Sequence, residues 1–246
     1  APPPLSPPAP ARAVSALPPA RHAPVAPTSM ASLAGSGAVS AQAALAAALS
    51  KHPARPFEDA EFETGLKIPS HGIKSLYAAK QQTKGKKVDS WARLSAMGGG
   101  GVDGSLLQLR EGPAEVTDGW LMGALGMVST NTRLTDALVA SAPPEVGMHV
   151  VRLYKDGEWI NVTVDDVLPC HGKHKPAYSS NAEPRDGPAA LVQKALAKLY
   201  GCYEQLRNGR VGAALVDLTG GSSDKVYLRD GLAGANGAPK QPQIVA

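Results

Sequence analysis

The sequence predicts an α+β fold for the central part of the chain. Met148–Lys155 and Trp159–Val164 alternate apolar and polar residues around Asp156 and Gly157, which indicates two strands joined by a tight turn. An apolar stripe at helical spacing follows the helix-start signal Asp186-Gly187-Pro188 and comprises Leu191, Val192, Ala195, Leu196, Leu199 and Cys202 or Tyr203. A strand pair and a separate amphipathic helix together indicate α+β architecture.

Residues 1–56 are predicted to form a disordered, basic arm rich in proline and alanine. Twelve of the 22 prolines lie before residue 57, in runs such as APPPLSPPAPAR. Such runs favour an extended chain with polyproline II character and no packed core. We expect the globular part at 57–221, followed by a glycine-rich C-terminal extension at 222–246.

One short helix is expected inside the arm, near residues 41–52. Ser40 can cap its start, Leu45 and Leu49 share one face, and Pro53 would end it. A helix of this length is marginal in water by itself. It therefore needs a surface to lie on, either in its own domain or in a partner.

The positive charge of the chain belongs to the arm. Arg12, Arg21, Lys51 and Arg55 precede the first acidic residue, Glu58, and account for the whole formal charge of +4. The remaining basic and acidic residues cancel. A folded nucleic-acid binder clusters lysine and arginine on the domain itself, so the pattern argues against a nucleic-acid partner.

The composition bears on the membrane and the compartment. Val25–Ser50 carries no charge, but small and polar residues dominate it and Pro27 interrupts it, so no membrane span is expected. Two cysteines, without a CxxC pair, fit a reducing, cytoplasmic compartment. The acid-free, serine-rich flank also resembles a transit peptide, and import into an organelle stays open beside a plain tail.

Two polar constellations allow alternative interpretations. Cys170, His171 and His174 suggest a metal site or a second nucleophile, but adjacent residues seldom converge on one ion, and an exposed loop is the favoured alternative. Asp165 and Asp166 resemble paired carboxylates for acid and base chemistry. The alternative is a structural turn after a strand, and we favour it.

Six motifs in order along residues 57–221 carry a resemblance to a known family. They are FEDAEF at 57–62, Trp91 with Arg93, TDGWLMGAL at 117–125, GEWINVTVDDVLP at 157–169, LVQKALAKLYGCYEQL at 191–206 and DLTGG at 217–221. This series resembles the catalytic core of calpains, the calcium-dependent cysteine proteases, and their relatives in flagellated protists. The resemblance implies the first subdomain of a calpain/papain-like core, which carries the nucleophile helix.

The nucleophile of that family is missing. The resemblance aligns the catalytic cysteine with Gly119, between Asp118 and Trp120. Glycine has no side chain, so covalent thiol catalysis at this position is excluded. Six residues earlier the family has a glutamine that donates to the oxyanion. Here Pro113 has neither an amide side chain nor a backbone N–H.

The catalytic histidine and asparagine of the family are also expected to be absent. In calpains they lie in a second half, well beyond the TGG motif, and this sequence continues for only 25 residues after Gly221. Without that half, the side of the nucleophile helix that faces the cleft would be open to solvent or to another protein. We therefore expect no enzyme activity.

No metal site and no cofactor are expected either. Nine residues before the nucleophile, calpains place an aspartate in a calcium loop, where this chain has Arg110. A cation repels calcium. Asp103 and Glu183 lie in neighbouring stretches, but two oxygen donors are too few for a calcium site.

The resemblance and the arm together lead to a functional hypothesis. The chain would be an inactive structural or scaffolding module in a cytoskeletal or axonemal assembly, in the cytoplasm or the flagellum. Its partners would be filament or axonemal proteins or another calpain-like chain. The interaction surface would combine Asp118 and Trp120 with the basic residues of the arm: Arg12, Arg21, Lys51 and Arg55. The alternative is a regulatory pseudoprotease that binds or modulates an active calpain.

Overall fold

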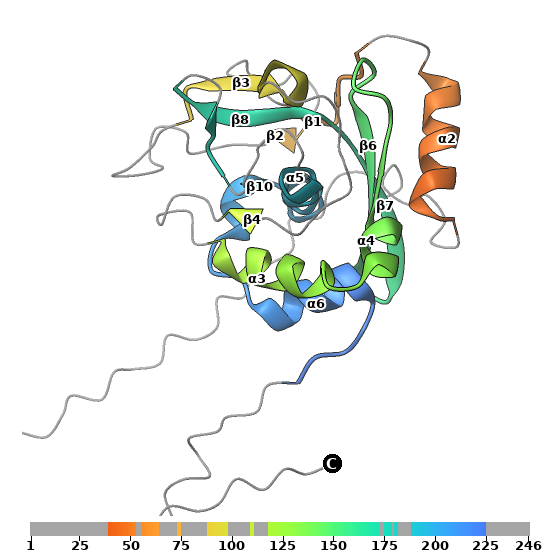
Figure 1. The fold of residues 1–246 in the computed structure, drawn as a ribbon, viewed down its shortest axis with the longest axis vertical. Coiled ribbons are helices and arrows are strands. Elements are labelled where there is room, and N and C mark those ends of the chain that lie inside the picture. The colour runs from red at the N-terminus through yellow and green to blue at the C-terminus, as the bar shows by residue number, and fades with distance from the viewer. Residues whose placement is uncertain are drawn as a thin grey trace, which may run out of the picture.

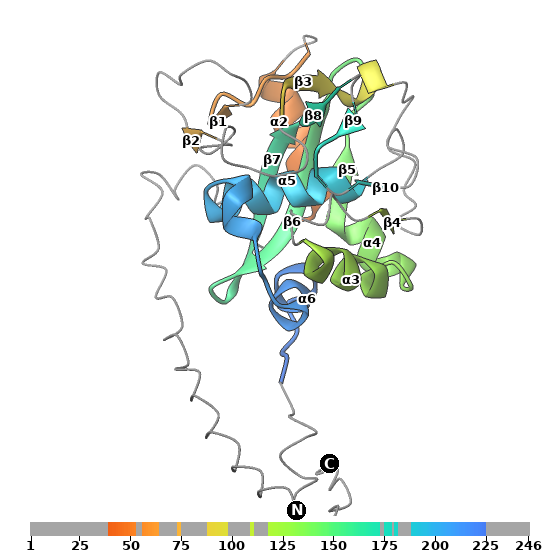
Figure 2. The same cartoon turned by 90° about the vertical axis from the view of Figure 1, so that its left-hand side faces the viewer.

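The computed structural model confirms the α+β fold (Figures 1 and 2). It describes residues 39–52, 56–63, 73–74, 88–97, 109–110, 118–172, 175–178, 180–181 and 188–224. The predicted disorder of residues 1–38 and most of the predicted C-terminal extension lie outside these ranges.

The helices of the described part fall into two kinds. The α-helices are α2 (Ala41–Lys51), α3 (Gly119–Val128), α4 (Thr132–Leu138), α5 (Pro188–Tyr200) and α6 (Val211–Thr219). Two short 3₁₀ helices lie at Leu94–Met97 and Tyr203–Leu206. None of the helices in these ranges has the length and apolar character needed to cross a membrane.

The strands form two three-stranded antiparallel sheets and two isolated pairs. One sheet has the order β5 (Val139–Ser141), β6 (Met148–Lys155), β7 (Glu158–Asp165), and the other β3 (Ser90–Arg93), β8 (Val167–His171), β9 (Lys175–Pro176). The parallel pair is β1 (Phe62–Glu63) with β2 (Ile73–Lys74), and the antiparallel pair is β4 (Leu109–Arg110) with β10 (Ser180–Asn181).

The predicted hairpin is confirmed as β6 and β7. Tyr154 lies opposite Trp159, and the strands are joined by Asp156 and Gly157. Both turn residues have positive φ angles, 52° and 91°, which are the angles that a two-residue hairpin turn requires. Aspartate and glycine tolerate these angles better than most residues, so the local sequence fixes the register of the hairpin.

Helix α5 lies in the middle of the fold, between the sheets and α3 (Figures 1 and 2). It begins at Pro188, as predicted, because the first helical position needs no backbone N–H. Every residue from Pro188 to Leu199 is buried, not only the apolar stripe. The prediction of a single buried face was therefore too narrow. It missed Gln193, Lys194 and Lys198, whose burial depends on polar partners elsewhere in the chain.

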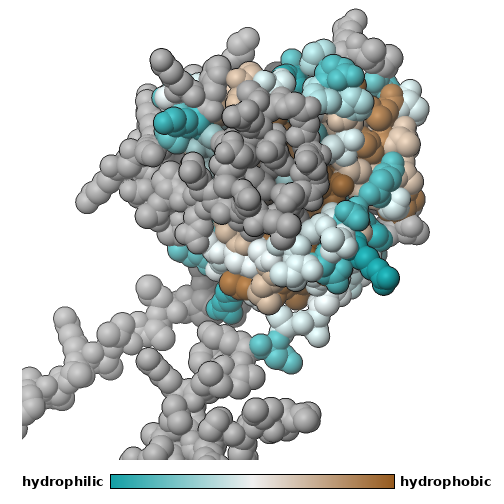
Figure 3. All heavy atoms as spheres, viewed as in Figure 1, coloured by the Kyte–Doolittle hydropathy of each residue, from teal (hydrophilic) through white to brown (hydrophobic). Residues whose placement is uncertain are grey.

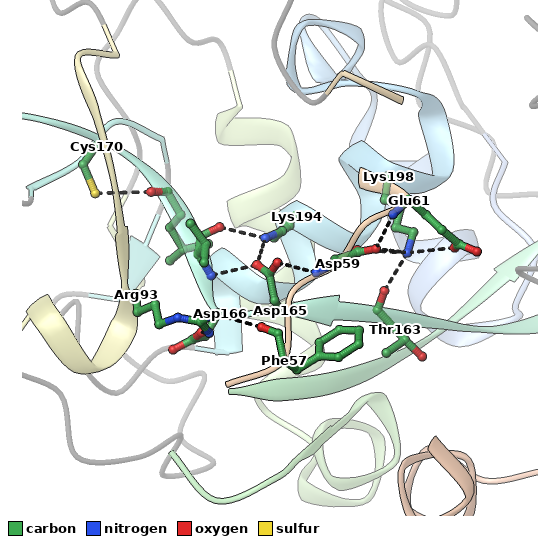
Figure 4. A network of polar contacts seen from close by, with 12 residues as sticks. Phe57, Asp59, Glu61, Arg93, Thr163, Asp165, Asp166, Cys170, Lys194 and Lys198 are labelled. Carbon is green, nitrogen blue, oxygen red and sulfur yellow. Dashed lines mark hydrogen bonds and ion pairs between the residues drawn. The ribbon is translucent and has the colours of Figure 1, made fainter. Parts of the chain in front are cut away.

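Lys194 pairs with the end of β7 (Figure 4). Its Nζ donates to Asp165 Oδ1 and, at 2.7 Å, to the Val167 carbonyl. The Asp165 carboxylate also accepts the backbone N–H groups of Asp59 at 2.8 Å and Val167 at 2.9 Å. Burial alone would raise the pKa of Asp165, but the charge of Lys194 and these hydrogen bonds hold it below its ordinary value.

Lys198, one turn further along α5, binds the segment before β1 (Figure 4). Its Nζ donates to both carboxylate oxygens of Asp59 at 2.9 Å and to the Thr163 carbonyl at 2.9 Å, with Glu61 at 3.3 Å. The two lysines therefore join α5, β7 and the 56–63 segment. The structural interpretation of the Asp165-Asp166 pair is confirmed, since Asp166 binds Arg93.

Helix α2 covers one face of the β5–β6–β7 sheet (Figure 1). Ser40 caps it by accepting the Ala43 N–H at 3.2 Å, as predicted. Its buried residues Ala41 and Leu45 pack in a cluster with Ala140, Met148 and Val150 of the sheet and with Ala142, which follows β5. The surface that this short helix requires is thus the domain's own sheet, and the packing extends across the predicted boundary at residue 57.

We predict that Lys194→Met destabilises the protein strongly. The substitution leaves the Asp165 carboxylate buried beside an apolar side chain, which should lower the free energy of unfolding by about 3–5 kcal/mol. Urea unfolding measures the change. Lys175→Met is the matched control because Lys175 is exposed, and its effect should stay within about 0.5 kcal/mol. Equal losses in the two variants would contradict a structural role for the buried pair.

We also predict that His149 makes the fold sensitive to acid. His149 is 3% exposed, and its Nδ1 lies 2.9 Å from Ser141 Oγ. Burial, assisted by the charge of Lys194 and opposed by Asp165, lowers its pKa from 6.5 to about 4. The unfolded chain takes up a proton at higher pH than the folded chain, so this contribution to stability is lost as the pH falls through that window.

The expected loss from this one group between pH 7 and pH 5 is about 2 kcal/mol in the free energy of unfolding. His149→Gln removes the titrating ring and keeps a polar group near Ser141. Urea titrations of both proteins at the two pH values give the comparison. If the variant lost as much free energy of unfolding between these pH values as the original chain, His149 would not be the source of the acid sensitivity.

Candidate functional site

The position predicted for the nucleophile is the first residue of a helix. Helix α3 begins at Gly119, and the Asp118 carbonyl accepts the N–H groups of Leu121 at 2.9 Å and Met122 at 3.2 Å. The run after Gly119 is strongly apolar, and Leu121, Met122, Ala124, Leu125 and Val128 are buried. Burial of this face against α5 and α6 holds the start of the helix in place.

Asp118 is turned into the protein and not toward solvent. Its side chain is 2% exposed, and its carboxylate accepts the Gln193 side-chain amide at 2.9 Å. This contact ties the start of α3 to α5. It also corrects our placement of the Asp118 carboxylate on an exposed interaction surface, because the group is buried and hydrogen bonded.

Trp120 closes over the loop between the second 3₁₀ helix and α6. Its indole Nε1 donates to the Leu206 carbonyl at 2.9 Å, and the ring is half-buried. A Cβ atom at Gly209 would lie 2.2 Å from the indole, so only glycine allows the ring to lie there. Trp120 was predicted as a site residue from the sequence, and Gly209 was not. An isolated glycine in the exposed RNGR stretch was the available signal.

The outer side of α3 is small and open. Gly119 is half-buried and Gly123, one turn later, is exposed. A Cβ atom at Gly123 would meet Val211 of α6 at 3.9 Å, an ordinary contact distance. Residue 119 therefore offers only backbone atoms at a helix start. Such an arrangement can present peptide groups to a partner but has no nucleophile of its own.

Both cysteines of the chain are buried thiols. Cys170 lies in β8 and is fully buried, which corrects the prediction of an exposed loop at this point. Cys202 is buried beside the second 3₁₀ helix. Burial raises the pKa of both thiols to about 11. At neutral pH they are protonated, and the thiolate is the reactive form.

Other predicted site residues fall partly outside the described ranges. Pro113, Asp103, Glu183, His174 and the arm residues Arg12, Arg21 and Arg55 are among those not described, and only the backbone of Arg110 is placed, in β4. Lys51 is exposed in the last turn of α2. Within the described ranges, no three His, Cys, Asp or Glu residues converge as metal ligands.

Comparison with known proteins agrees with the motifs. The family profile described as "Calpain family cysteine protease" matches residues 57–243, which includes much of the segment predicted as a C-terminal extension. "Calpain-type cysteine protease DEK1" of Arabidopsis thaliana is 31% identical over 204 residues, covering 79% of this chain and 9% of that protein.

Two further relatives show the same pattern of partial coverage. "Calpain-type cysteine protease ADL1" of Oryza sativa subsp. japonica is 36% identical over 112 residues, 46% of this chain and 5% of that protein. "Calpain-1 catalytic subunit" of Gallus gallus is 29% identical over 184 residues, 70% of this chain and 24% of that protein. The chain thus spans between 5% and 24% of the length of these relatives. Since the matched family range contains the β6–β7 hairpin, the buried helix α5 and the start of α3, the chain belongs to the calpain family of cysteine proteases.

Proposed function

We propose that this chain is a catalytically inactive calpain-like module that acts by binding, as a structural or scaffolding component of a larger cytoskeletal or axonemal assembly. One observation carries the proposal. The first residue of α3, where a calpain nucleophile is expected, is Gly119, and it provides no reactive atom. Loss of the nucleophile removes covalent catalysis and leaves a folded surface.

Two hydrogen bonds hold the residues on either side of Gly119. Asp118 is bound by Gln193, and Trp120 is bound by the Leu206 carbonyl. Neither contact needs a side chain at residue 119. A module whose helix start is held in this way but has no thiol can present a fixed surface to another protein. This supports a binding function in preference to a catalytic one.

The arm supports a filament as the partner. Its four basic residues all precede the first acidic residue of the chain, Glu58, and Arg12 and Arg21 are more than 35 residues away from it. Such a segment can lie along an acidic filament, with an attraction that salt screens. The proposal therefore includes a location in the cytoplasm, on the cytoskeleton or in the flagellum, with import into an organelle left open.

A second candidate is regulation of an active calpain, and an exposed apolar surface favours it. Met127 of α3 is 57% exposed and Val211 of α6 is 39% exposed. Figure 3 shows apolar surface along the lower edge of the molecule, where α3 and α6 lie in Figure 1. Apolar side chains on two adjacent helices can contact another protein.

We predict that the purified chain does not hydrolyse casein, with or without calcium. Gly119→Cys should introduce a thiol that iodoacetamide alkylates faster than Cys170 or Cys202, because a helix start favours the thiolate and burial disfavours it. Mass spectrometry of the alkylated peptides measures the rates. Gly123→Cys is the matched control, since it is exposed on the same helix one turn further from the start.

Two results would contradict this prediction. Casein hydrolysis by the purified original chain would show that it is an active protease. Equal alkylation of the thiols introduced at 119 and 123 would show that the start of α3 no longer has the electrostatic character of a nucleophile site.

For the arm, we predict a loss of filament binding when its charge is removed. Alanine at positions 12, 21, 51 and 55 should reduce co-sedimentation with microtubules and its dependence on salt, since each lost cation removes one contact to the acidic surface. The matched control replaces four exposed basic residues of the body by alanine: Arg133, Lys175, Arg207 and Arg210. Unchanged microtubule binding in the arm variant, or an equal loss of binding in the arm variant and the control, would count against the arm as the filament-binding segment.

A further inference from the structure

Helix α2 and its cluster occupy only one end of a sheet face. Side chains alternate along a strand, so Met148, Val150, Arg152 and Tyr154 of β6 share the face that α2 covers. The cluster under α2 includes Met148 and Val150. Toward the hairpin turn, Arg152 and Tyr154 are half-buried and are not members of that cluster.

Three side chains at this end form what we call the aromatic platform: Arg152, Tyr154 and Trp159. The Arg152 guanidinium carbon lies 4.5 Å from the centre of the Trp159 ring. Tyr154 meets the same ring edge to face, with centroids 5.4 Å apart and planes at 70°. Stacking of this kind fixes the ring orientation before any ligand arrives.

The end of α6 supports the platform. A Cβ atom at Gly220 would lie 2.9 Å from the Trp159 ring and 3.4 Å from Tyr154, so the backbone of the TGG motif contacts both aromatic residues. Gly220 ends α6 with a φ angle of 69°, which glycine adopts without strain. The platform is therefore held by a rigid element and not only by the hairpin.

The arm enters the described fold beside the platform. Asn161 Nδ2 donates to the Val39 carbonyl at 3.0 Å, immediately before the Ser40 cap of α2. Asn161 lies opposite Arg152 and two residues from Trp159, hence on the same face of the sheet. Two residues along a strand span about 7 Å, so Val39, where the arm enters the described fold, is close to the platform.

The arm contains a segment whose chemistry suits aromatic rings. Residues 18–27 read PPARHAPVAP, with prolines at 18, 19, 24 and 27 and a basic residue, Arg21. Proline-rich segments in polyproline II conformation dock on surfaces lined with aromatic side chains. The hairpin turn next to the platform adds two exposed carboxylates, Asp156 and Glu158. Asp156 also lies 3.8 Å from Lys155 Nζ, but its side chain is 75% exposed, so both carboxylates can attract Arg21.

The length of the connecting chain permits the contact. Residues 28–38 separate this segment from Val39 and, fully extended, reach at most about 40 Å. Tethering through so short a connection gives the segment a high effective concentration at the platform, so a weak contact suffices.

We propose that residues 18–27 dock on the aromatic platform of the same chain, with prolines against Trp159 and Tyr154 and Arg21 near the acidic turn. In the docked state the arm lies against its own module, and Arg21 is withdrawn from other partners. The platform thus acts as an internal binding site for the arm. This inference does not depend on the proposed scaffolding role.

Limited trypsin digestion of the full chain tests the docking, because docking protects the bond after Arg21 more than the bond after Arg12. The measured quantity is the cleavage rate after Arg21 divided by the cleavage rate after Arg12, both obtained by mass spectrometry. Trp159→Ala should raise this ratio severalfold. Glycine at 18, 19 and 24 should do the same without altering the folded part.

Combining the two sets separates docking from a local effect on the protease site. If the prolines act through Trp159, the glycine substitutions should have no further effect in the Trp159→Ala background. A fully additive effect, or no effect of Trp159→Ala in a folded protein, would overturn the proposal.

The acidic turn provides a variant that spares the aromatic residues. Asp156→Asn with Glu158→Gln should raise the ratio partly, whereas the matched exposed pair Asp136→Asn with Glu145→Gln should leave it unchanged. Equal effects of the two pairs on the ratio would count against the proposal. This comparison does not require the Trp159→Ala variant, so it stays decisive if that variant fails to fold. Protection that disappears on dilution would show that the arm of a second copy occupies the platform, and intramolecular docking would be wrong.

Discussion

Two lysines buried on one helix set the arrangement of the fold. Lys194 and Lys198 of α5 are almost without exposure, and a buried ammonium group is costly unless it is paired and hydrogen bonded. Asp165 at the end of β7 and Asp59 before β1 provide the pairing. Because both carboxylates must reach α5, the hairpin and the 56–63 segment have little freedom to pack elsewhere.

The candidate site depends on the same helix. Gln193 precedes Lys194 on α5 and binds the Asp118 carboxylate, so the start of α3 is positioned by an element that the lysine pairs already hold. None of these contacts involves the side chain at residue 119. The start of α3 is therefore positioned by contacts of the neighbouring residues Asp118 and Trp120, which do not depend on which side chain stands at residue 119.

The sequence predicted those elements whose conformation depends on interactions between residues close together in the chain. The turn at Asp156-Gly157 and the Ser40 cap are examples, because each depends on residues a few positions apart. The two residues whose location was predicted wrongly share another cause. Asp118 was expected on the surface and Cys170 in a loop, but the burial of Asp118 depends on Gln193, 75 residues away, and the strand of Cys170 pairs with Ser90. Periodicity contains no information about such partners.

The N-terminal region belongs to the packed fold more closely than its composition suggests. Helix α2 precedes the range that matches the family, yet it buries Met148 and Val150 on a face of the sheet that would otherwise be apolar and open. The opposite face of the same strands packs on α5, through side chains such as Val151 and Leu153. The sheet thus lies between a helix of the family core and a helix of the arm. Because α2 packs on β6, and β6 pairs along its whole length with the strand whose end binds Lys194, the packing of the arm helix and the buried ion pair depend on the same hairpin.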